Sequence, residues 1–202
     1  ILTYAKSFGG GKASIAGYTT RPSFFERAYG NLADSILHST TYNGFGEETI
    51  TAIEAINIVV EEDYVARSEE IYDRLNTGLR ALQKKYPSLI DEVRGSGALN
   101  GIVLNKNIFS TMQSVITKIP NELLKDERFV AKLITSSVIS ELFNGHNILT
   151  FYGDNREIPL IFSPSLIVTD REIDRLLTAI DQVLSMGKLK LLTKFIIQKW
   201  GS

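Results

Sequence analysis

The sequence predicts an α/β chain in which a long helix joins two regions of different character. Residues 47 to 86 repeat apolar side chains at three- and four-residue steps, the spacing of an amphipathic helix. After Pro87, two apolar runs flank Arg94-Gly95-Ser96-Gly97, which is typical of strand, tight turn and strand. A second helix is indicated from Thr169, because Glu172 follows at the spacing of a capping box.

The first 46 residues contain short elements separated by loops, and residues 1 to 22 are expected to form a loop, the glycine turn, a strand and an exit. Ala13 to Tyr18 is a strand candidate made of small residues. Pro22 indicates the first turn of a helix, where the missing N–H of proline costs nothing. Residues 30 to 46 are rich in Gly, Asn, Ser and Thr, so we expect a loop.

The long helix is expected to carry two apolar stripes and one irregularity. The stripes comprise Ile50, Ile53, Ile56 and Val60, and then Ile71, Leu75, Leu79 and Leu82. Polarity changes near Glu61, Glu62 and Asp63, which indicates either a bend or a buried first half followed by an exposed second half. Pro87 ends the helix.

Downstream of Pro87 we expect a short, largely antiparallel sheet covered by helices. The expected strands are Ile90–Val93, Leu99–Leu104, Asn147–Tyr152 and Leu160–Phe162. A helix is expected at Phe129–Phe143, between the second and third of these strands. Pro159 and Pro164 restrict the last strands to the edges or ends of the sheet. The capped helix from Thr169 buries one face, composed of Ile173, Leu176, Leu177, Ile180, Val183 and Leu184.

Composition is that of an ordinary globular chain and excludes several kinds of site. The 202 residues carry a formal net charge of −1, with 44% hydrophobic and 22% charged residues, so no nucleic-acid partner is indicated. The absence of cysteine excludes disulfides, thiol catalysis and cysteine-based zinc sites. His38 and His146 are the only histidines and lie far apart in the sequence, so no histidine-rich metal site is expected.

No targeting or membrane segment is indicated within the chain. A charged leader followed by an apolar core does not open it, and no apolar run reaches spanning length. We therefore expect a cytoplasmic protein without a membrane partner. The chain opens at Ile1 rather than at a methionine, so a leader could precede it.

Lys6 is the first candidate functional residue. It lies just before the three glycines Gly9–Gly11. A primary amine confined in such a turn can form a Schiff base with pyridoxal phosphate and can later carry a proton. The alternative is a surface lysine beside a flexible glycine connector. A phosphate-binding P-loop is excluded, because Lys12 is followed by Ala13 rather than by serine or threonine.

The second candidate is a hydroxyl-rich loop, His38-Ser39-Thr40-Thr41-Tyr42-Asn43-Gly44, which precedes the long helix. Hydroxyl donors and free backbone N–H groups can share the negative charge of a phosphate. The same residue types are common in turns and helix caps, so the loop by itself leaves both interpretations open.

Four segments, in one order, carry a family resemblance. They are Ala5-Lys6 with Gly9-Gly10-Gly11 and Ile15-Ala16-Gly17; His38-Ser39-Thr40-Thr41-Tyr42 with Gly44; Val93-Arg94-Gly95-Ser96-Gly97 with Gly101; and Ser163-Pro164-Ser165-Leu166 with Glu172-Ile173-Asp174. They are similar to the Schiff-base lysine segment, the H-x-[ST]-T-[FY]-x-G loop, the V-R-G-x-G turn and the closing P-P-L and E-I-D stretch of the class III pyridoxal-phosphate-dependent aminotransferases. The chain thus resembles the C-terminal portion of such an enzyme, with fold type I architecture.

The resemblance implies roles for single residues. Lys6 would be the catalytic residue that forms the Schiff base with pyridoxal 5'-phosphate and moves the proton. Thr41, with Thr40 beside it, would bind the cofactor phosphate, and in this family that threonine comes from the neighbouring subunit of a homodimer. His38, Gly95 and Gly97 would be structural. The implied partners are a small-molecule amino donor, a carbonyl acceptor and a second copy of the chain, and no metal is implied.

The resemblance also divides the chain into three parts. Residues 1 to 46 would be the tail of the large cofactor-binding domain, residues 47 to 87 an inter-domain helix, and residues 88 to 202 a small C-terminal α+β domain. In this family the acidic partner of the ring nitrogen, the glycine-rich phosphate loop and the stacking aromatic lie upstream of the lysine. The chain is therefore expected to be incomplete for catalysis.

Two stretches depart from the family pattern. Ile161 stands where the family often has an arginine for a substrate carboxylate, and an aliphatic side chain cannot make that bidentate contact, which disfavours glutamate as amino donor. Arg156 takes that place only with a shift in alignment. Phe45-Gly46-Glu47-Glu48 stands where Asn-Pro is common; its acids suit a helix N-terminus but oppose a phosphate placed too close.

Alternatives to an aminotransferase stay open at this point. A racemase, epimerase, mutase or decarboxylase of the same fold would share the lysine, because pocket geometry decides which bond is cleaved. A non-catalytic dimerisation module is the other alternative. The final stretch, Gly187–Ser202, alternates apolar residues with lysines, which is typical of a helix at a membrane surface or partner. A terminal helix packed on its own domain is favoured.

Overall fold

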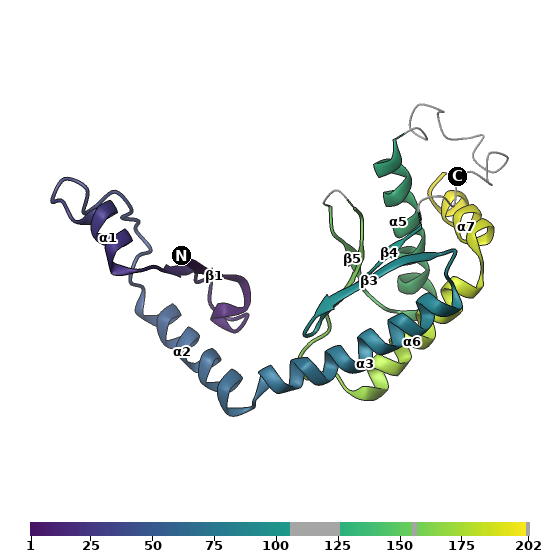
Figure 1. Ribbon diagram of the computed structural model, residues 1–202, viewed down its shortest axis with the longest axis horizontal. Helices are drawn as coiled ribbons and strands as arrows, with labels where there is room; N and C mark the ends of the chain where they lie inside the picture. The colour runs from purple at the N-terminus through teal and green to yellow at the C-terminus, as the bar shows by residue number, and fades with distance from the viewer. Residues whose placement is uncertain (106–125, 155–156, 201–202) are drawn as a thin grey trace. The chain divides into compact units, whose positions relative to one another are not determined.

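The computed structural model describes residues 1–105, 126–154 and 157–200. The chain divides into two compact units, Ile1–Val65 and Ala66–Ser202, and each is described by itself. Both units combine helices with strands (Figure 1), so the predicted mixture of α and β structure is confirmed. The boundary between the units falls inside the segment expected to link two domains.

The first unit contains a small hairpin, a short turn and two helices. Its elements are β1 (Leu2–Tyr4), the 3-10 turn η1 (Lys6–Gly9), β2 (Gly17–Thr19), α1 (Pro22–Tyr29) and α2 (Gly46–Glu61). Strands β1 and β2 pair antiparallel, with Thr3 opposite Tyr18. Pro22 occupies the first turn of α1, as predicted.

The hairpin corrects one sequence-based expectation. Leu2–Tyr4 was expected to be loop and forms a strand, whereas the predicted strand Ala13–Tyr18 is strand only from Gly17 onward. The pairing depends on Gly17, because a Cβ there would lie 2.5 Å from the ring of Tyr4. The Tyr4 ring therefore lies over the partner backbone, a contact that no local pattern reveals.

The first unit has almost no apolar core. Its only buried residues are Gly9 and Ala52. Most apolar side chains of α2 are exposed, with Ile50 at 69% and Val60 at 72%. The first stripe of the expected long helix therefore has no cover within this unit.

The expected long helix is two helices. Helix α2 ends at Glu61, and α3 (Tyr64–Lys85) begins after Asp63, whose φ of 47° is left-handed. The bend predicted at the acidic cluster is confirmed. The alternative of a buried first half is wrong, because α2 buries only Ala52 whereas α3 buries Ile71, Leu75, Asn76, Leu79 and Leu82.

The second unit contains a four-stranded antiparallel sheet. Its strands are β3 (Ile90–Ser96), β4 (Leu99–Leu104), β5 (Phe151–Tyr152) and β6 (Leu160–Phe162), and their order across the sheet is β3-β4-β6-β5. The predicted hairpin turns at Gly97, whose φ of 54° suits only glycine well. β6 is an interior strand, and Pro159 and Pro164 lie outside its ends.

Four helices of the second unit share one apolar core with the sheet. They are α3, α5 (Glu127–His146), α6 (Asp170–Ser185) and α7 (Lys188–Trp200). The fully buried side chains include Leu75 of α3, Ile102 of β4, Leu142 of α5 and Ile180 of α6. Burying a side chain of this kind stabilises the fold by about 1.5–3 kcal/mol.

Helix α6 begins with the predicted capping box. The Thr169 hydroxyl accepts from the Glu172 N–H at 3.3 Å, and the Glu172 carboxylate accepts from the Thr169 N–H at 2.8 Å. The backbone N–H of Thr169 and then its hydroxyl, which also donates to the Glu172 carboxylate at 2.7 Å, lower the pKa of Glu172. Two N–H groups that a helix end leaves unpaired are thereby satisfied.

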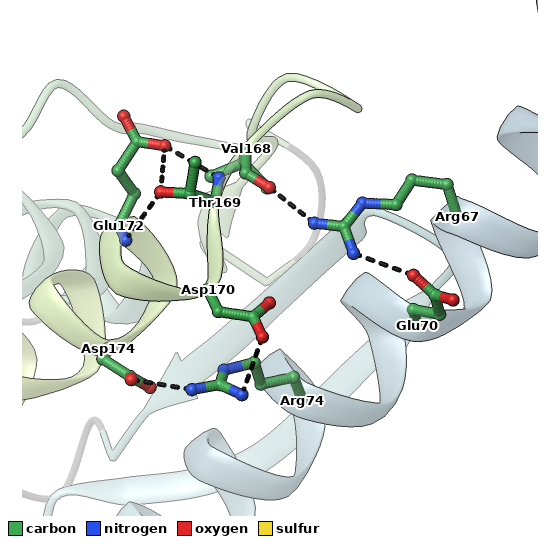
Figure 2. A network of polar contacts seen from close by, with 8 residues as sticks. All are labelled: Arg67, Glu70, Arg74, Val168, Thr169, Asp170, Glu172 and Asp174. Carbon is green, nitrogen blue, oxygen red and sulfur yellow. Dashed lines mark hydrogen bonds and ion pairs between the residues drawn. The ribbon is translucent and has the colours of Figure 1, made fainter. Parts of the chain in front are cut away.

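Charged side chains of α3 fasten it to the start of α6 (Figure 2). Arg74 contacts the carboxylates of Asp170 at 3.2 Å and Asp174 at 2.7 Å. Two turns earlier, Arg67 donates to the backbone carbonyl of Val168 at 2.5 Å. α3 and α6 therefore lie side by side, joined by polar bonds at their edge as well as by the core.

The C-terminal helix packs on its own unit. Leu191, Leu192 and Phe195 of α7 are buried in the common core, and Lys194 pairs with the buried Glu141 of α5 at 2.6 Å. These contacts support the packed-helix interpretation over a membrane-surface helix. Within the described residues, no helix is both long and apolar enough to span a bilayer.

Candidate active site

Lys6 lies where the backbone leaves β1 and enters the η1 turn. Its φ of 66° is left-handed, a conformation that costs a residue other than glycine about 1–2 kcal/mol. Gly10 ends the turn, and its N–H donates to the Ser7 carbonyl at 2.9 Å. Strain at a residue with a reactive side chain is typical of functional sites.

The glycines after Lys6 allow close packing and are not a flexible connector. Gly9 is buried, and a Cβ there would lie 3.1 Å from Ile15 Cγ2. Gly10 has a φ of 62°, and a Cβ there would lie 3.1 Å from Ala55 Cβ of α2. The turn is thus packed against α2.

The side chain of Lys6 is exposed and has no partner. It makes no hydrogen bond or ion pair with any residue that the structure describes. Lys85, Lys132 and Lys194 differ, since each contacts a carboxylate within 3.0 Å. An unpaired primary amine is the group that a covalent bond to an aldehyde requires.

The hydroxyl-rich loop is closed by its own hydrogen bonds. The Thr40 hydroxyl donates to Asn43 Oδ1 at 2.9 Å, and Asn43 Nδ2 donates to the His38 carbonyl at 3.0 Å. Thr41 is exposed and makes no hydrogen bond through its side chain within the described residues. Thr41 therefore offers a free hydroxyl, whereas Thr40 already uses its proton inside the loop.

His38 is held by two tyrosines. Tyr29 Oη lies 3.1 Å from His38 Nδ1, and the Tyr18 ring stacks on the imidazole with centroids 5.9 Å apart. A longer hydrogen bond from Tyr18 to Tyr29, at 3.5 Å, raises the pKa of Tyr18. The same rings line a cavity of about 700 Å³. The expected structural role of His38 is consistent with these contacts.

Lys6 and the two threonines are not brought together within one chain. Lys6 follows β1 and packs near α2, whereas Thr40 and Thr41 lie in the loop after α1. No hydrogen bond joins Lys6 to either threonine in the described residues. Groups of three or more potential metal-binding side chains are absent from the same residues.

Comparison with known proteins identifies the family. The model of the aminotransferase class-III family matches residues 1–184. This chain belongs to the class III aminotransferases. One curated relative is aminotransferase PigE of Serratia sp. (strain ATCC 39006), 23% identical over 89% of this chain and 24% of its own length. Another is an uncharacterized aminotransferase of Schizosaccharomyces pombe (strain 972 / ATCC 24843), 24% identical over 91% of this chain and 35% of its own length.

Solved aminotransferases share the fold. The ornithine aminotransferase of Toxoplasma gondii has a TM-score of 0.68 at 20% identity, covering 96% of this chain and 37% of that one. The adenosylmethionine-8-amino-7-oxononanoate aminotransferase of Methanocaldococcus jannaschii has a TM-score of 0.68 at 21% identity, covering 92% and 38%. The expected fold type I architecture is confirmed. The chain spans only 24% and 35% of the length of these two curated relatives.

Pyridoxal 5'-phosphate is the cofactor of class III aminotransferases, so the predicted cofactor is confirmed for the family. The Toxoplasma structure is described with partial occupancy of that cofactor at its active site. The residues present in this chain fit it chemically. Lys6 has an unpaired amine, the group that would bond to the aldehyde, and Thr41 has an unused hydroxyl, a group that could donate to the phosphate.

Ile161, the position that departs from the class III pattern, lies on β6. Its neighbours Leu160 and Phe162 are buried in the core, so the half-buried Ile161 side chain points to the opposite face of the sheet. Gly101 and Phe151 lie directly opposite it on the adjacent strands and share that face. Arg156 lies outside the described residues.

The V-R-G-x-G turn of this class III aminotransferase is structural, as expected. The buried Asn100 donates through Nδ2 to the Gly97 carbonyl at 3.0 Å, and it accepts from Asn76 Nδ2 at 3.2 Å. A Cβ at Gly95 would lie 2.2 Å from Asn100 Oδ1. Gly95 therefore makes room for the buried amide network, and Gly97 contributes its carbonyl to that network.

Sequence reasoning missed the tyrosines beside His38. Tyr18 and Tyr29 lie 20 and 9 positions before His38 and carry no recognisable motif. They meet it only because β2, α1 and the following loop fold onto one another. No periodicity or spacing in the sequence signals that contact.

Proposed function

We propose that the protein is a pyridoxal-phosphate-dependent aminotransferase that moves an amino group between an amine or amino acid and a carbonyl acceptor. The supporting observation is Lys6, an exposed and unpaired amine on a strained, tightly packed turn. The family match over most of the chain supports the same reaction class.

In this proposal Lys6 performs two tasks. When bound, the cofactor supplies an electron sink for the bond that breaks at the substrate carbon. Lys6 Nζ would hold the cofactor covalently through its aldehyde carbon. As a free amine, Nζ would accept the α proton of the substrate as a general base and give a proton back as a general acid.

The proposal includes a homodimer in which Thr41, with Thr40 beside it, binds the phosphate of the neighbouring subunit's cofactor. One observation supports it. Large apolar side chains around the loop are exposed, with Leu37 at 71% and Tyr42 at 78%, as expected of a surface that another polypeptide covers.

The family often has an arginine for a substrate carboxylate where this chain has Ile161, so the proposal includes an amino donor other than glutamate. Ile161 and Phe151 offer an apolar surface there, and the nearest guanidinium in the same row, Arg94, is already paired with Glu92 and Glu157. Ile161→Arg should therefore raise kcat/KM for a donor with a second carboxylate, such as glutamate, by about tenfold or more relative to a simple amine. An unchanged donor preference contradicts this assignment.

Borohydride trapping of the intact protein tests the proposal. Reduction with bound pyridoxal phosphate, followed by peptide mapping, should place the label on Lys6. Lys6→Ala should lose the label and at least about a thousandfold of the rate, because covalent and proton-transfer roles are both removed. Lys12→Ala, six residues along in the same exposed segment, is the matched control and should keep both.

An acceptor assay separates the reaction types. Transamination requires a carbonyl co-substrate for each turnover, whereas racemisation, mutation or decarboxylation does not. Product formed at full rate without any carbonyl acceptor contradicts the aminotransferase proposal. Label on a lysine other than Lys6, or a fully active Lys6→Ala protein, contradicts the assignment of the catalytic amine.

A further inference from the structure

We infer that Tyr29 is a positioning residue for the cofactor phosphate, because it holds His38 and thereby fixes the loop that presents Thr41. The inference rests on the proposed function, in which Thr41 binds that phosphate. It concerns a residue outside the four segments that carry the family resemblance.

The imidazole of His38 is fixed from two directions. Tyr29, the last residue of α1, places its hydroxyl 3.1 Å from Nδ1. Tyr18, in the middle of β2, stacks on the ring with an interplanar angle of 15°. A helix end and a paired strand therefore meet at this one side chain, which ties the start of the loop to regular structure.

The rest of the loop is tied to His38 through Asn43. The Asn43 amide donates to the His38 carbonyl at 3.0 Å, and its oxygen accepts from the Thr40 hydroxyl at 2.9 Å. The Asn43 N–H also donates to the Thr40 carbonyl at 3.2 Å. The backbone on both sides of Thr41 is therefore closed into one hydrogen-bonded ring.

The two neighbouring threonines differ in the hydrogen bonding of their hydroxyls. The Thr40 proton is committed to Asn43, whereas the Thr41 hydroxyl has no partner among the described residues. Holding a ligating hydroxyl in place before the ligand arrives reduces the ordering cost of binding. The contact of Tyr29 with His38 contributes to this ordering, because His38 is the residue at which the hydrogen-bonded loop begins.

Tyr29→Phe in the intact holoenzyme tests the inference, with pyridoxal 5'-phosphate and pyridoxal as the two probes. Loss of one hydrogen bond that orders the loop should raise the dissociation constant for pyridoxal phosphate about three- to tenfold. The dissociation constant for pyridoxal, which has no phosphate, should stay unchanged. Tyr152→Phe on β5 is the matched control and should alter neither constant.

Combining Tyr29→Phe with Thr41→Val tests the route. If Tyr29 acts through Thr41, adding Tyr29→Phe to the Thr41→Val variant should raise the dissociation constant for pyridoxal phosphate by less than about twofold. Equal weakening of both probes, no change in either, or full additivity overturns the inference. The Phe25 ring lies 5.1 Å from that of Tyr29, a contact that the phenylalanine variant keeps.

A second variant guards against misfolding. His38→Asn removes the imidazole itself and should reproduce the selective loss for pyridoxal phosphate; weakening of both probes by the same factor overturns the inference here too. Failure of the proposed function has a different signature, because the unsubstituted protein would then give no borohydride-stable adduct at Lys6 with either probe.

Discussion

The two units of the chain differ in what holds them together. Ala66–Ser202 has an extended apolar core shared by a sheet and four helices, whereas Ile1–Val65 buries only Gly9 and Ala52. The first unit nevertheless carries both candidate cofactor contacts, Lys6 and Thr41. The unit with the candidate residues therefore buries little of its apolar surface within itself, whereas the other unit builds a core of its own.

The largest expected effect comes from separating the units. Residues 66–202 expressed alone should unfold cooperatively on heating, because their core is complete within the fragment. Residues 1–65 alone should give a far-ultraviolet spectrum close to that of an unfolded chain. Circular dichroism of both fragments measures this, and a cooperative transition in the shorter one would contradict the comparison.

A pair of matched substitutions sharpens the contrast at single residues. Leu75 is fully buried in α3, so Leu75→Ala should lower the free energy of unfolding of the 202-residue chain by about 2–5 kcal/mol. Ile53 is 53% exposed in α2, and Ile53→Ala should cost less than about 0.5 kcal/mol. Urea denaturation of both variants is the measurement. Equal losses would mean that α2 is covered within this chain.

The polar fastening between α3 and α6 should contribute less than the core. Arg74→Ala removes its bonds to Asp170 and Asp174, both at exposed positions, so the midpoint of urea denaturation should fall much less than for Leu75→Ala. The loss should shrink in high salt, because surface charges are screened. Arg171→Ala, an exposed arginine of α6 without these bonds, is the control for urea denaturation. A loss as large as that of Leu75→Ala would indicate that these ion pairs support the core.

The smallest effect is an acid dependence confined to the second unit. Lys85 and then Tyr86, through hydrogen bonds to the carboxylate, lower the pKa of Asp181. A carboxylate with a lowered pKa stabilises the fold above its unfolded pKa of about 4, and that stability is lost as the pH falls through the folded value. Asp181→Asn should therefore cost less than about 1 kcal/mol at pH 7 and nothing near pH 2. A loss independent of pH would point to packing instead of charge.

The sequence predicted elements where local chemistry decides the structure. The capping box at Thr169, the proline at the start of α1 and the hairpin around Gly97 follow from residue type and spacing, and each is observed. Contacts between distant residues escaped prediction. β1 forms because Tyr4 lies over Gly17, and β6 becomes an interior strand because it pairs with both β4 and β5.

The candidate site likewise has features that the sequence could predict and features that it could not. Lys6 and Thr41 could be chosen from motif and residue type, and the structure leaves both side chains exposed and unpaired in its described part. The left-handed backbone at Lys6 and the contact of Tyr29 with His38 could not be predicted. Both arise from how the chain turns in three dimensions, and neither leaves a periodic trace in the sequence.

The left-handed backbone at position 6 favours a residue other than the lysine that the proposed reaction needs. Glycine suits a φ of 66° best, whereas the proposed Schiff base requires the amine of a lysine. Under that proposal, Lys6→Gly should gain about 1 kcal/mol in conformational energy while abolishing turnover. Selection for heat resistance alone would then be expected to replace this lysine, whereas selection for turnover would retain it.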